Sequence, residues 1–149
     1  MDDIIQLTKV CLAYGSRLVL RDIDLQVKPG QFWFVLGPNG EGKTTLLRAM
    51  LGLLAPAAGT VRWREHDRRH ERTGFVPQRC DLNPSLPTTV REFVLLGLTG
   101  RRIPRAERQD RLHRALRQVD LHLLECNDYW SLSGGQRQRA LLARALVRQ

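Results

Sequence analysis

The first third of the chain is dominated by short alternations of apolar and polar residues. Residues 4–14 and 18–27 are rich in Ile, Leu and Val and roughly alternate with polar residues, which is typical of strands with one buried face. Gly15 and Ser16 mark a turn between them. The run at 31–36 is almost continuously apolar and lies between two glycines, so it predicts a short strand that is buried on both faces.

The apolar spacing then changes to that of helices. Residues 44–54 carry leucines at helical intervals, and Pro56 and Gly59 follow this segment. Thr88 or Thr89 can cap a helix that runs through Gly97, since Glu92 stands three residues after Thr89, as in a capping box. The remaining predicted elements are strands at 60–63 and 74–78, an amphipathic helix at 105–124, and a last helix from near Ser133. The pattern predicts an α/β fold.

Composition fits one globular domain of 149 residues, with 42% hydrophobic and 26% charged residues. No apolar run is long enough to cross a membrane, and the acidic start at Met1 is unlike a signal peptide. These features lead us to expect a cytoplasmic protein. The net charge of +9 indicates either attraction to an acidic partner or a solvated basic surface, and we favour the second because few aromatic residues lie among the arginines.

The cysteine and histidine residues predict no metal site. Cys11, Cys80 and Cys126 are too scattered for a C-x-x-C motif, which indicates free thiols. His66 and His70 stand at helical spacing in a highly charged stretch, but a metal site would need a third ligand, so a surface loop is the simpler interpretation.

A phosphate-binding loop follows the strand predicted at 31–36. Gly37, Gly42, Lys43 and Thr44 satisfy G-x-x-x-x-G-K-[ST], and the helical pattern follows directly. The glycines allow several N–H groups to face one anion, and the helix adds the partial positive charge of its N-terminus. The residues expected to bind the nucleotide in this loop are Gly37, Pro38, Asn39, Gly40, Gly42, Lys43 (β- and γ-phosphates), Thr44 (Mg²⁺) and Thr45 (α-phosphate). Glu41 is a carboxylate inside this anion site, so we expect only its backbone to face the phosphates.

A second motif, Leu132-Ser133-Gly134-Gly135-Gln136, places a hydroxyl and glycine amides at the start of the last helix. It resembles the signature of ATP-binding-cassette (ABC) ATPases, and with the phosphate loop before it the resemblance extends over essentially the whole chain. The resemblance implies the fold of a P-loop NTPase ABC nucleotide-binding domain, with an antiparallel β layer, part of the core sheet and a helical subdomain. It also implies that Ser133, Gly134, Gly135 and Gln136 contact ATP held on the loop of a second cassette, in a head-to-tail homodimer or with another subunit.

Other residues take their expected roles from the same resemblance. Tyr14 matches the aromatic residue that stacks on adenine, although it could also be a strand-end packing residue. Gln78 matches a catalytic glutamine that contacts Mg²⁺ and the attacking water. The expected cofactors are ATP and Mg²⁺. The expected partner is a transmembrane permease, with the chain peripheral on the inner face of the membrane and no nucleic acid as partner.

The resemblance also suggests subdivisions and a transporter type. It implies one partial domain, 1–149, made of a β layer and loop core (1–81), a helical subdomain (82–131) that docks on the permease, and the signature helix (132–149). The stretches at 76–79 and 86–94 look most like importers of zinc or manganese, which implies import of a metal ion.

ABC ATPases continue beyond the signature helix to an Asp-Glu pair and a later His, which this sequence does not include before Gln149. We therefore expect little turnover of ATP by these 149 residues alone, from a truncated product or an incomplete sequence. Two alternatives stay open: a soluble ABC protein without a permease, and a noncatalytic nucleotide-binding remnant.

Overall fold

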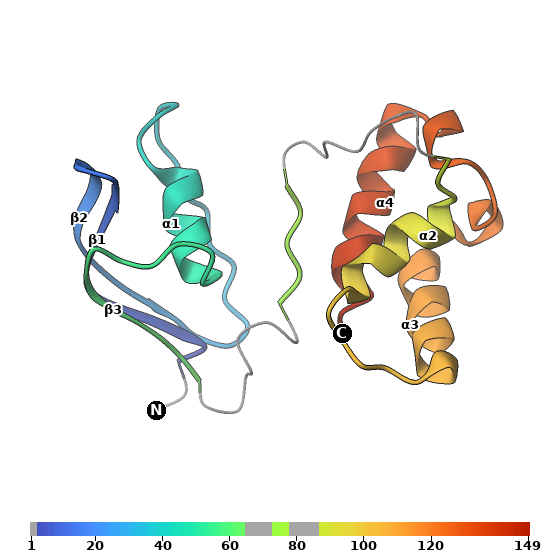
Figure 1. Cartoon of the computed structure of the whole chain (residues 1–149), viewed down its shortest axis with the longest axis horizontal. Coiled ribbons are helices and arrows are strands. Elements are labelled where there is room, and N and C mark those ends of the chain that lie inside the picture. The colour runs from blue at the N-terminus through green and yellow to red at the C-terminus, as the bar shows by residue number, and fades with distance from the viewer. Residues whose placement is uncertain (1–2, 65–72, 78–86) are drawn as a thin grey trace. The chain divides into compact units, whose positions relative to one another are not determined.

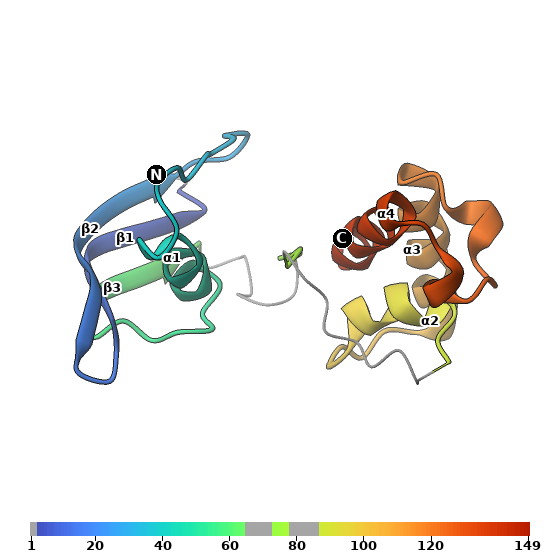
Figure 2. The same ribbon diagram turned by 90° about the horizontal axis from the view of Figure 1, so that it is seen from above.

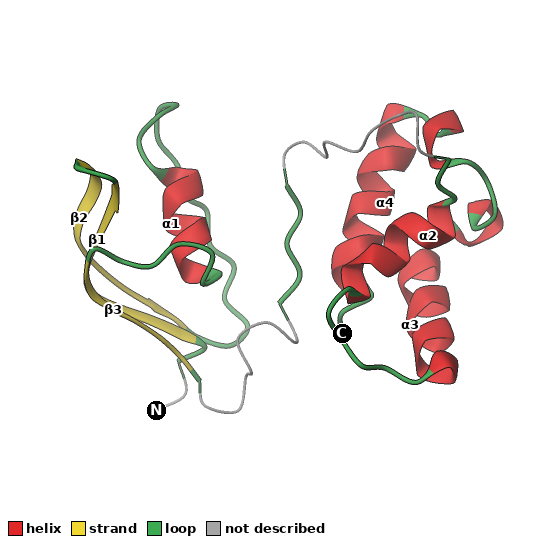
Figure 3. Ribbon diagram, in the orientation of Figure 1, coloured by secondary structure: helices red, strands yellow, loops and turns green. Residues whose placement is uncertain are grey.

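The computed structural model describes residues 3–64, 73–77 and 87–149, which fall into two compact units, Met1–His70 and Glu71–Gln149 (Figure 1). In its described residues the first unit has a three-stranded antiparallel sheet in the order β2-β1-β3, with one helix, α1. The second unit is helical in its described residues (Figure 3). Gln78, the predicted catalytic glutamine, lies outside the described residues, as do His66, His70 and Cys80, for which no metal site was predicted.

The sheet of the first unit is centred on β1 (Ile5–Tyr14), which pairs with β2 (Arg17–Val27) and with β3 (Ala58–Trp63). The three strands predicted at 4–14, 18–27 and 60–63 are confirmed, with β3 beginning two residues earlier than expected. Burial along β1 changes phase between Leu7 and Val10, where the register with both neighbours shifts. Lys9 lies in this irregularity with a φ of 50°, a left-handed conformation that is uncommon for a residue with a side chain.

The phase change brings all the buried residues of β1 to one side of the sheet. They form the core of the first unit with Ala49 of α1 (Lys43–Met50), which lies across that face of the sheet (Figure 2). The β1 residues of this cluster are Ile5, Leu7, Val10 and Leu12. The phosphate-loop helix is therefore seated on the β layer by apolar contact.

The prediction of a buried strand at residues 31–36 is wrong. Residues 31–38 are not assigned to any strand, and the side chains of Phe32, Phe34 and Leu36 are 82%, 75% and 87% exposed. The apolar run has the composition of an inner strand, but within the described residues no neighbouring strand lies beside it to bury it. Residues 74–77, which were also predicted to be a strand, are likewise irregular.

Where the structure describes it, the helical unit consists of three α-helices and short 3₁₀ turns. They are α2 (Val90–Leu95), η1 (Leu96–Leu98), α3 (Arg105–Gln118), η2 (His122–Leu124), η3 (Tyr129–Ser131) and α4 (Gly134–Leu146). The core centres on Phe93, whose ring stacks on Tyr129 with centroids 4.3 Å apart. The guanidinium of Arg144 lies 5.1 Å from the centroid of Phe93, which adds a cation–π contact to this core.

The predicted helix at 105–124 is interrupted after Gln118. Asp120 adopts a φ of 53°, its N–H donates to the Arg117 carbonyl, and the Leu121 N–H donates to the Leu116 carbonyl. This pair of bonds is a Schellman motif, in which a left-handed residue ends a helix. Leu116 and Leu121 are both buried, so an apolar contact accompanies the motif. The sequence prediction joined α3 and η2 because the leucine spacing continues across this break.

Among the described residues, no helix has both the length and the apolar character that crossing a membrane requires.

Candidate functional site

The phosphate loop is held against the sheet at Gly42. This glycine has a φ of 87° and is buried, and a Cβ atom built on it would lie 2.9 Å from a methyl group of Val19 and 3.0 Å from Leu20 Cγ. Both the backbone conformation and the close approach to β2 therefore require glycine. The fit between Gly42 and β2 fixes where the loop ends and α1 begins.

The N-terminus of α1 offers unsatisfied donors. Its N-cap residue, Gly42, makes no side-chain cap, and the first turn contains no acidic residue. The first backbone bond of the helix runs from the Leu46 N–H to the Gly42 carbonyl. The N–H groups that precede it are the ones that an α-helix cannot satisfy itself, and the helix dipole adds positive potential there. This end of α1 can accept an anion without first displacing a capping side chain.

Lys43 adds a full positive charge at the same place. Its ammonium donates to the carbonyl oxygens of Gly37, at 2.7 Å, and Pro38, at 2.6 Å. An ammonium has three N–H donors, so one remains for a further acceptor. Thr44 is exposed, whereas Thr45 is only 7% exposed. The loop therefore closes on its own lysine, which keeps the cation beside the N-terminus of α1.

Tyr14 lies at the end of β1, and its hydroxyl is tied to α1. Arg48 Nη1 donates to the phenol oxygen at 3.3 Å. The hydrogen bond from Arg48, and after it one with Thr45, lowers the pKa of Tyr14 below its usual value. The side chain remains 45% exposed. The structure thus connects Tyr14 with a residue of the phosphate loop, a link that the sequence prediction did not include.

The second motif forms the start of α4. Ser133 is the N-cap: its hydroxyl accepts a hydrogen bond from the Gln136 N–H at 3.3 Å, and its own N–H donates to Gln136 Oε1 at 2.8 Å. Gly134 and Gly135 are exposed, and a Cβ atom added to either would meet nothing within 4 Å. Packing within the unit therefore does not require glycine at these two positions, and their N–H groups begin a helix at an open surface.

Two arginines just after the motif fix its position in the helical unit. Arg137 donates to the Trp130 carbonyl at 2.6 Å and lies 5.4 Å from the centroid of the Trp130 ring. Arg139 donates to the Val119 carbonyl at 3.2 Å and to the Asp120 carbonyl at 3.3 Å, at the end of α3. The sequence alone does not predict these contacts, because the acceptors are backbone carbonyls and leave no trace in the sequence.

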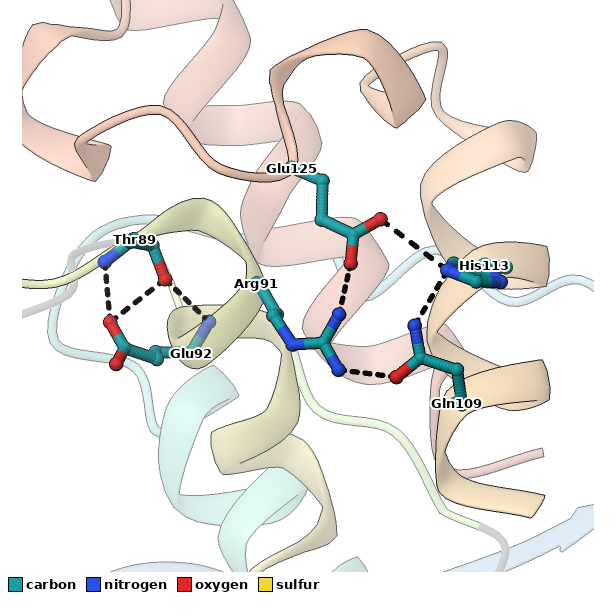
Figure 4. A network of polar contacts seen from close by, with 6 residues as sticks. All are labelled: Thr89, Arg91, Glu92, Gln109, His113 and Glu125. Atoms are coloured by element: carbon teal, nitrogen blue, oxygen red, sulfur yellow. Dashed lines mark hydrogen bonds and ion pairs between the residues drawn. The ribbon is translucent and has the colours of Figure 1, made fainter. Parts of the chain in front are cut away.

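A polar network ties α2 to α3 in the same unit (Figure 4). The guanidinium of Arg91 donates to Glu125 and to the side-chain oxygen of Gln109. The amide nitrogen of Gln109 lies 2.7 Å from His113 Nε2, which is 3.5 Å from the second oxygen of Glu125. Because Arg91 can only donate, the Gln109 oxygen must face it, and the amide NH₂ then donates to His113. The network supports the helical unit that carries the second motif.

Among the residues that the structure describes, no group of three or more His, Cys, Asp or Glu side chains could hold a metal ion. Of the two predicted Mg²⁺ ligands, Thr44 and Gln78, only Thr44 lies in the described residues.

The chain is similar to known ABC transporter proteins in both sequence and structure. A protein-family model described as ABC transporter matches residues 20–149. The zinc import ATP-binding protein ZnuC of Yersinia enterocolitica is 42% identical over 99% of this chain and 54% of its own length. The protein of the same name from Pseudomonas fluorescens (strain Pf0-1) is 42% identical over 99% of this chain and 52% of its own length. The chain thus spans about half the length of these curated relatives.

Among solved structures, cbiO1 from Clostridium perfringens, part of the ABC transporter complex cbiONQ, superposes with a TM-score of 0.82 at 27% identity. The superposition covers 99% of this chain and 62% of cbiO1.

Proposed function

Because the chain belongs to the ABC transporter family, we propose that it forms part of an ATP-binding subunit that couples ATP binding and hydrolysis to transport through a membrane permease. The observation that carries this proposal is the N-terminus of α1, where uncapped N–H groups, the Lys43 ammonium and a loop closed on that ammonium converge. Such an arrangement suits the phosphates of a nucleotide, whose negative charges need several fixed donors at once.

The proposed roles follow from the chemistry of each group. The loop from Gly37 to Gly42 would surround the phosphates with its backbone, and Lys43 would use its free N–H and its charge on the β- and γ-phosphates. The exposed Thr44 hydroxyl would be a ligand of Mg²⁺, which neutralises phosphate charge when bound. Thr45 would donate to the α-phosphate, and Gln78 would contact Mg²⁺ and the attacking water.

The second motif supplies the other half of the proposed arrangement. Ser133, Gly134, Gly135 and Gln136 would contact ATP that is bound to the loop of a partner cassette, in a head-to-tail pair. The open space above both glycines supports this role, since a bound phosphate could approach the start of α4 without meeting a side chain there.

We also propose that the transported substrate is a metal ion and that the subunit works on the inner face of the membrane, against its permease. Support comes from the relatives, each named a zinc import ATP-binding protein, at 42% identity over 99% of this chain. ATP-dependent zinc uptake into vesicles that contain the protein and its permease would test this assignment, and uptake that is indifferent to ATP would contradict it.

Nucleotide binding is tested with a matched pair of lysine variants of the full-length protein. Lys43→Ala should weaken ATP binding by about 10- to 100-fold, the effect expected for a lost charge-assisted hydrogen bond to phosphate. Lys28→Ala, at an exposed turn of the same unit, should leave binding unchanged. Equilibrium titration with a fluorescent ATP analogue measures both. Equal affinities of the two variants, or no saturable binding by the wild type, would contradict the proposal.

A further inference from the structure

A side-chain hydrogen bond joins Tyr14, at the end of β1, to Arg48 in the second turn of α1. Thr45 and Arg48 are three residues apart on α1 and therefore lie on one face of the helix, and both interact with the hydroxyl of Tyr14. Arg48 Nη1 donates to the phenol oxygen at 3.3 Å across a separation of 34 residues. This is a contact between a strand and the helix that begins at the phosphate loop.

The hydrogen bond restrains the hydroxyl end of the Tyr14 side chain and leaves the ring faces uncovered by it. A Tyr side chain has two rotatable bonds before its ring, and a hydrogen bond at the hydroxyl limits both. The side chain nevertheless remains 45% exposed, so much of the ring is still accessible to a ligand. The hydrogen bond from Arg48 also lowers the pKa of Tyr14, which is consistent with a hydroxyl that a cation holds in place.

We propose that Arg48 is a positioning residue for nucleotide binding: it holds the Tyr14 ring in the orientation that stacks on the base of a nucleotide whose phosphates occupy the loop. This inference rests on the proposed function. Since α1 carries Lys43 at its start and Arg48 in its second turn, one helix fixes both the phosphate site and the aromatic platform for the base. Arg48 itself acts through Tyr14 and needs no contact with the nucleotide.

The test compares a ligand that has a base with one that lacks it. In the full-length protein, Arg48→Ala should weaken ATP binding by about 3- to 10-fold, the range expected when an aromatic stacking contact loses its orientation. Binding of inorganic tripolyphosphate, which has no base to stack, should be unchanged. Arg21→Ala, which removes an exposed arginine from β2, should change the affinity for neither ATP nor tripolyphosphate and is the matched control.

A double-mutant cycle shows whether Arg48 acts through the phenol. Tyr14→Phe keeps the ring but loses the hydroxyl, so it should weaken ATP binding about as much as Arg48→Ala does. The double variant should be no weaker than either single variant. In addition, Arg48→Ala should raise the pKa of Tyr14 toward its ordinary value of 10.0, which NMR of the Tyr14 ring can follow without any nucleotide.

The outcomes separate this inference from the proposed function. Failure of the wild type to bind ATP would overturn both. If the wild type binds ATP, unchanged affinity in Arg48→Ala would overturn the positioning role alone. An equal loss of ATP and tripolyphosphate binding would also overturn the positioning role, because it would mean that Arg48 only supports the fold. Fully additive effects of Arg48→Ala and Tyr14→Phe in the double-mutant cycle would overturn it as well. Should Arg48→Ala fail to fold, Arg48→Gln and Tyr14→Phe provide the same comparison.

Discussion

Asp24 stabilises the irregular residue of β1. One carboxylate oxygen accepts the Lys9 N–H at 2.9 Å, and the other accepts from the Lys9 ammonium at 2.7 Å. These two bonds hold Lys9 in its left-handed conformation, which is otherwise unfavourable for a residue with a Cβ atom. Without this conformation, the buried side chains on either side of Lys9 would not share one face of the sheet.

The same contact predicts a pH dependence of stability. The hydrogen bonds from the Lys9 side chain and then from its backbone lower the pKa of Asp24 below its ordinary value of 3.8. The carboxylate therefore stabilises the fold above that value, and this stabilisation is lost as the pH falls through the lowered pKa of the folded state. Asp24→Asn should reduce the melting temperature at neutral pH, and the difference from wild type should shrink as the pH falls below 3.8.

Thermal unfolding followed by circular dichroism measures this difference. Asp22→Asn is the control, because it removes the same charge from the same strand without breaking the contact with Lys9. It should have the smaller effect at neutral pH. A difference between Asp24→Asn and wild type that persists unchanged in acid would contradict the prediction.

At the scale of single elements, two helices end in the same way with different residues. In α1 the left-handed residue is Gly52, whose N–H donates to the Ala49 carbonyl at 3.0 Å while the Leu53 N–H donates to Arg48 at 2.8 Å. In α3 the equivalent residue is Asp120, with a φ of 53°. Glycine adopts this conformation without a steric cost, whereas a residue with a Cβ atom does not. The end of α3 therefore has the less favourable residue.

This comparison predicts opposite effects of one substitution at two places on α3. Asp120→Gly should stabilise the protein by about 0.5–1 kcal/mol, after allowing for its weak contact with Arg139. Asp110→Gly, at an exposed position inside the helix, should destabilise it by about 0.3 kcal/mol, the difference in helix propensity between Asp and Gly. Urea denaturation of both variants measures the two free energies of unfolding. The same sign at both positions would contradict the assignment of Asp120 to the helix end.

Elements whose signals are local were predicted from the sequence, whereas those that depend on distant neighbours were not. The capping box at Thr89 and Glu92 was predicted, and so was a helix starting near Ser133, because their signals lie within four residues. The failure at 31–36 has a different origin: apolar composition indicates that a strand needs burial, but neighbours elsewhere in the fold must supply it. The phosphate loop was identified from its motif, whereas the Arg48–Tyr14 contact depends on how β1 and α1 pack.

For the whole chain, the α/β fold of an ABC ATP-binding domain is confirmed by the family match and by the superposition on cbiO1. Each unit nevertheless has its own hydrophobic cluster. The cluster of the first unit joins β1 to α1, and that of the second joins α2, α3 and α4. Since cooperative unfolding follows shared buried contacts, we expect the two units to lose structure separately.

Reciprocal cavity variants test this expectation. Leu112 and Leu12 are both completely buried, one in each cluster, and Leu→Ala at either should destabilise its own unit by about 2–5 kcal/mol. In Leu112→Ala, amide hydrogens of α3 and α4 should exchange faster while those of β1 keep their protection, because their hydrogen bonds belong to the sheet. Leu12→Ala should produce the opposite pattern. Hydrogen exchange read by mass spectrometry distinguishes the units, and faster exchange in both units from either substitution would mean that the chain unfolds as one cooperative body.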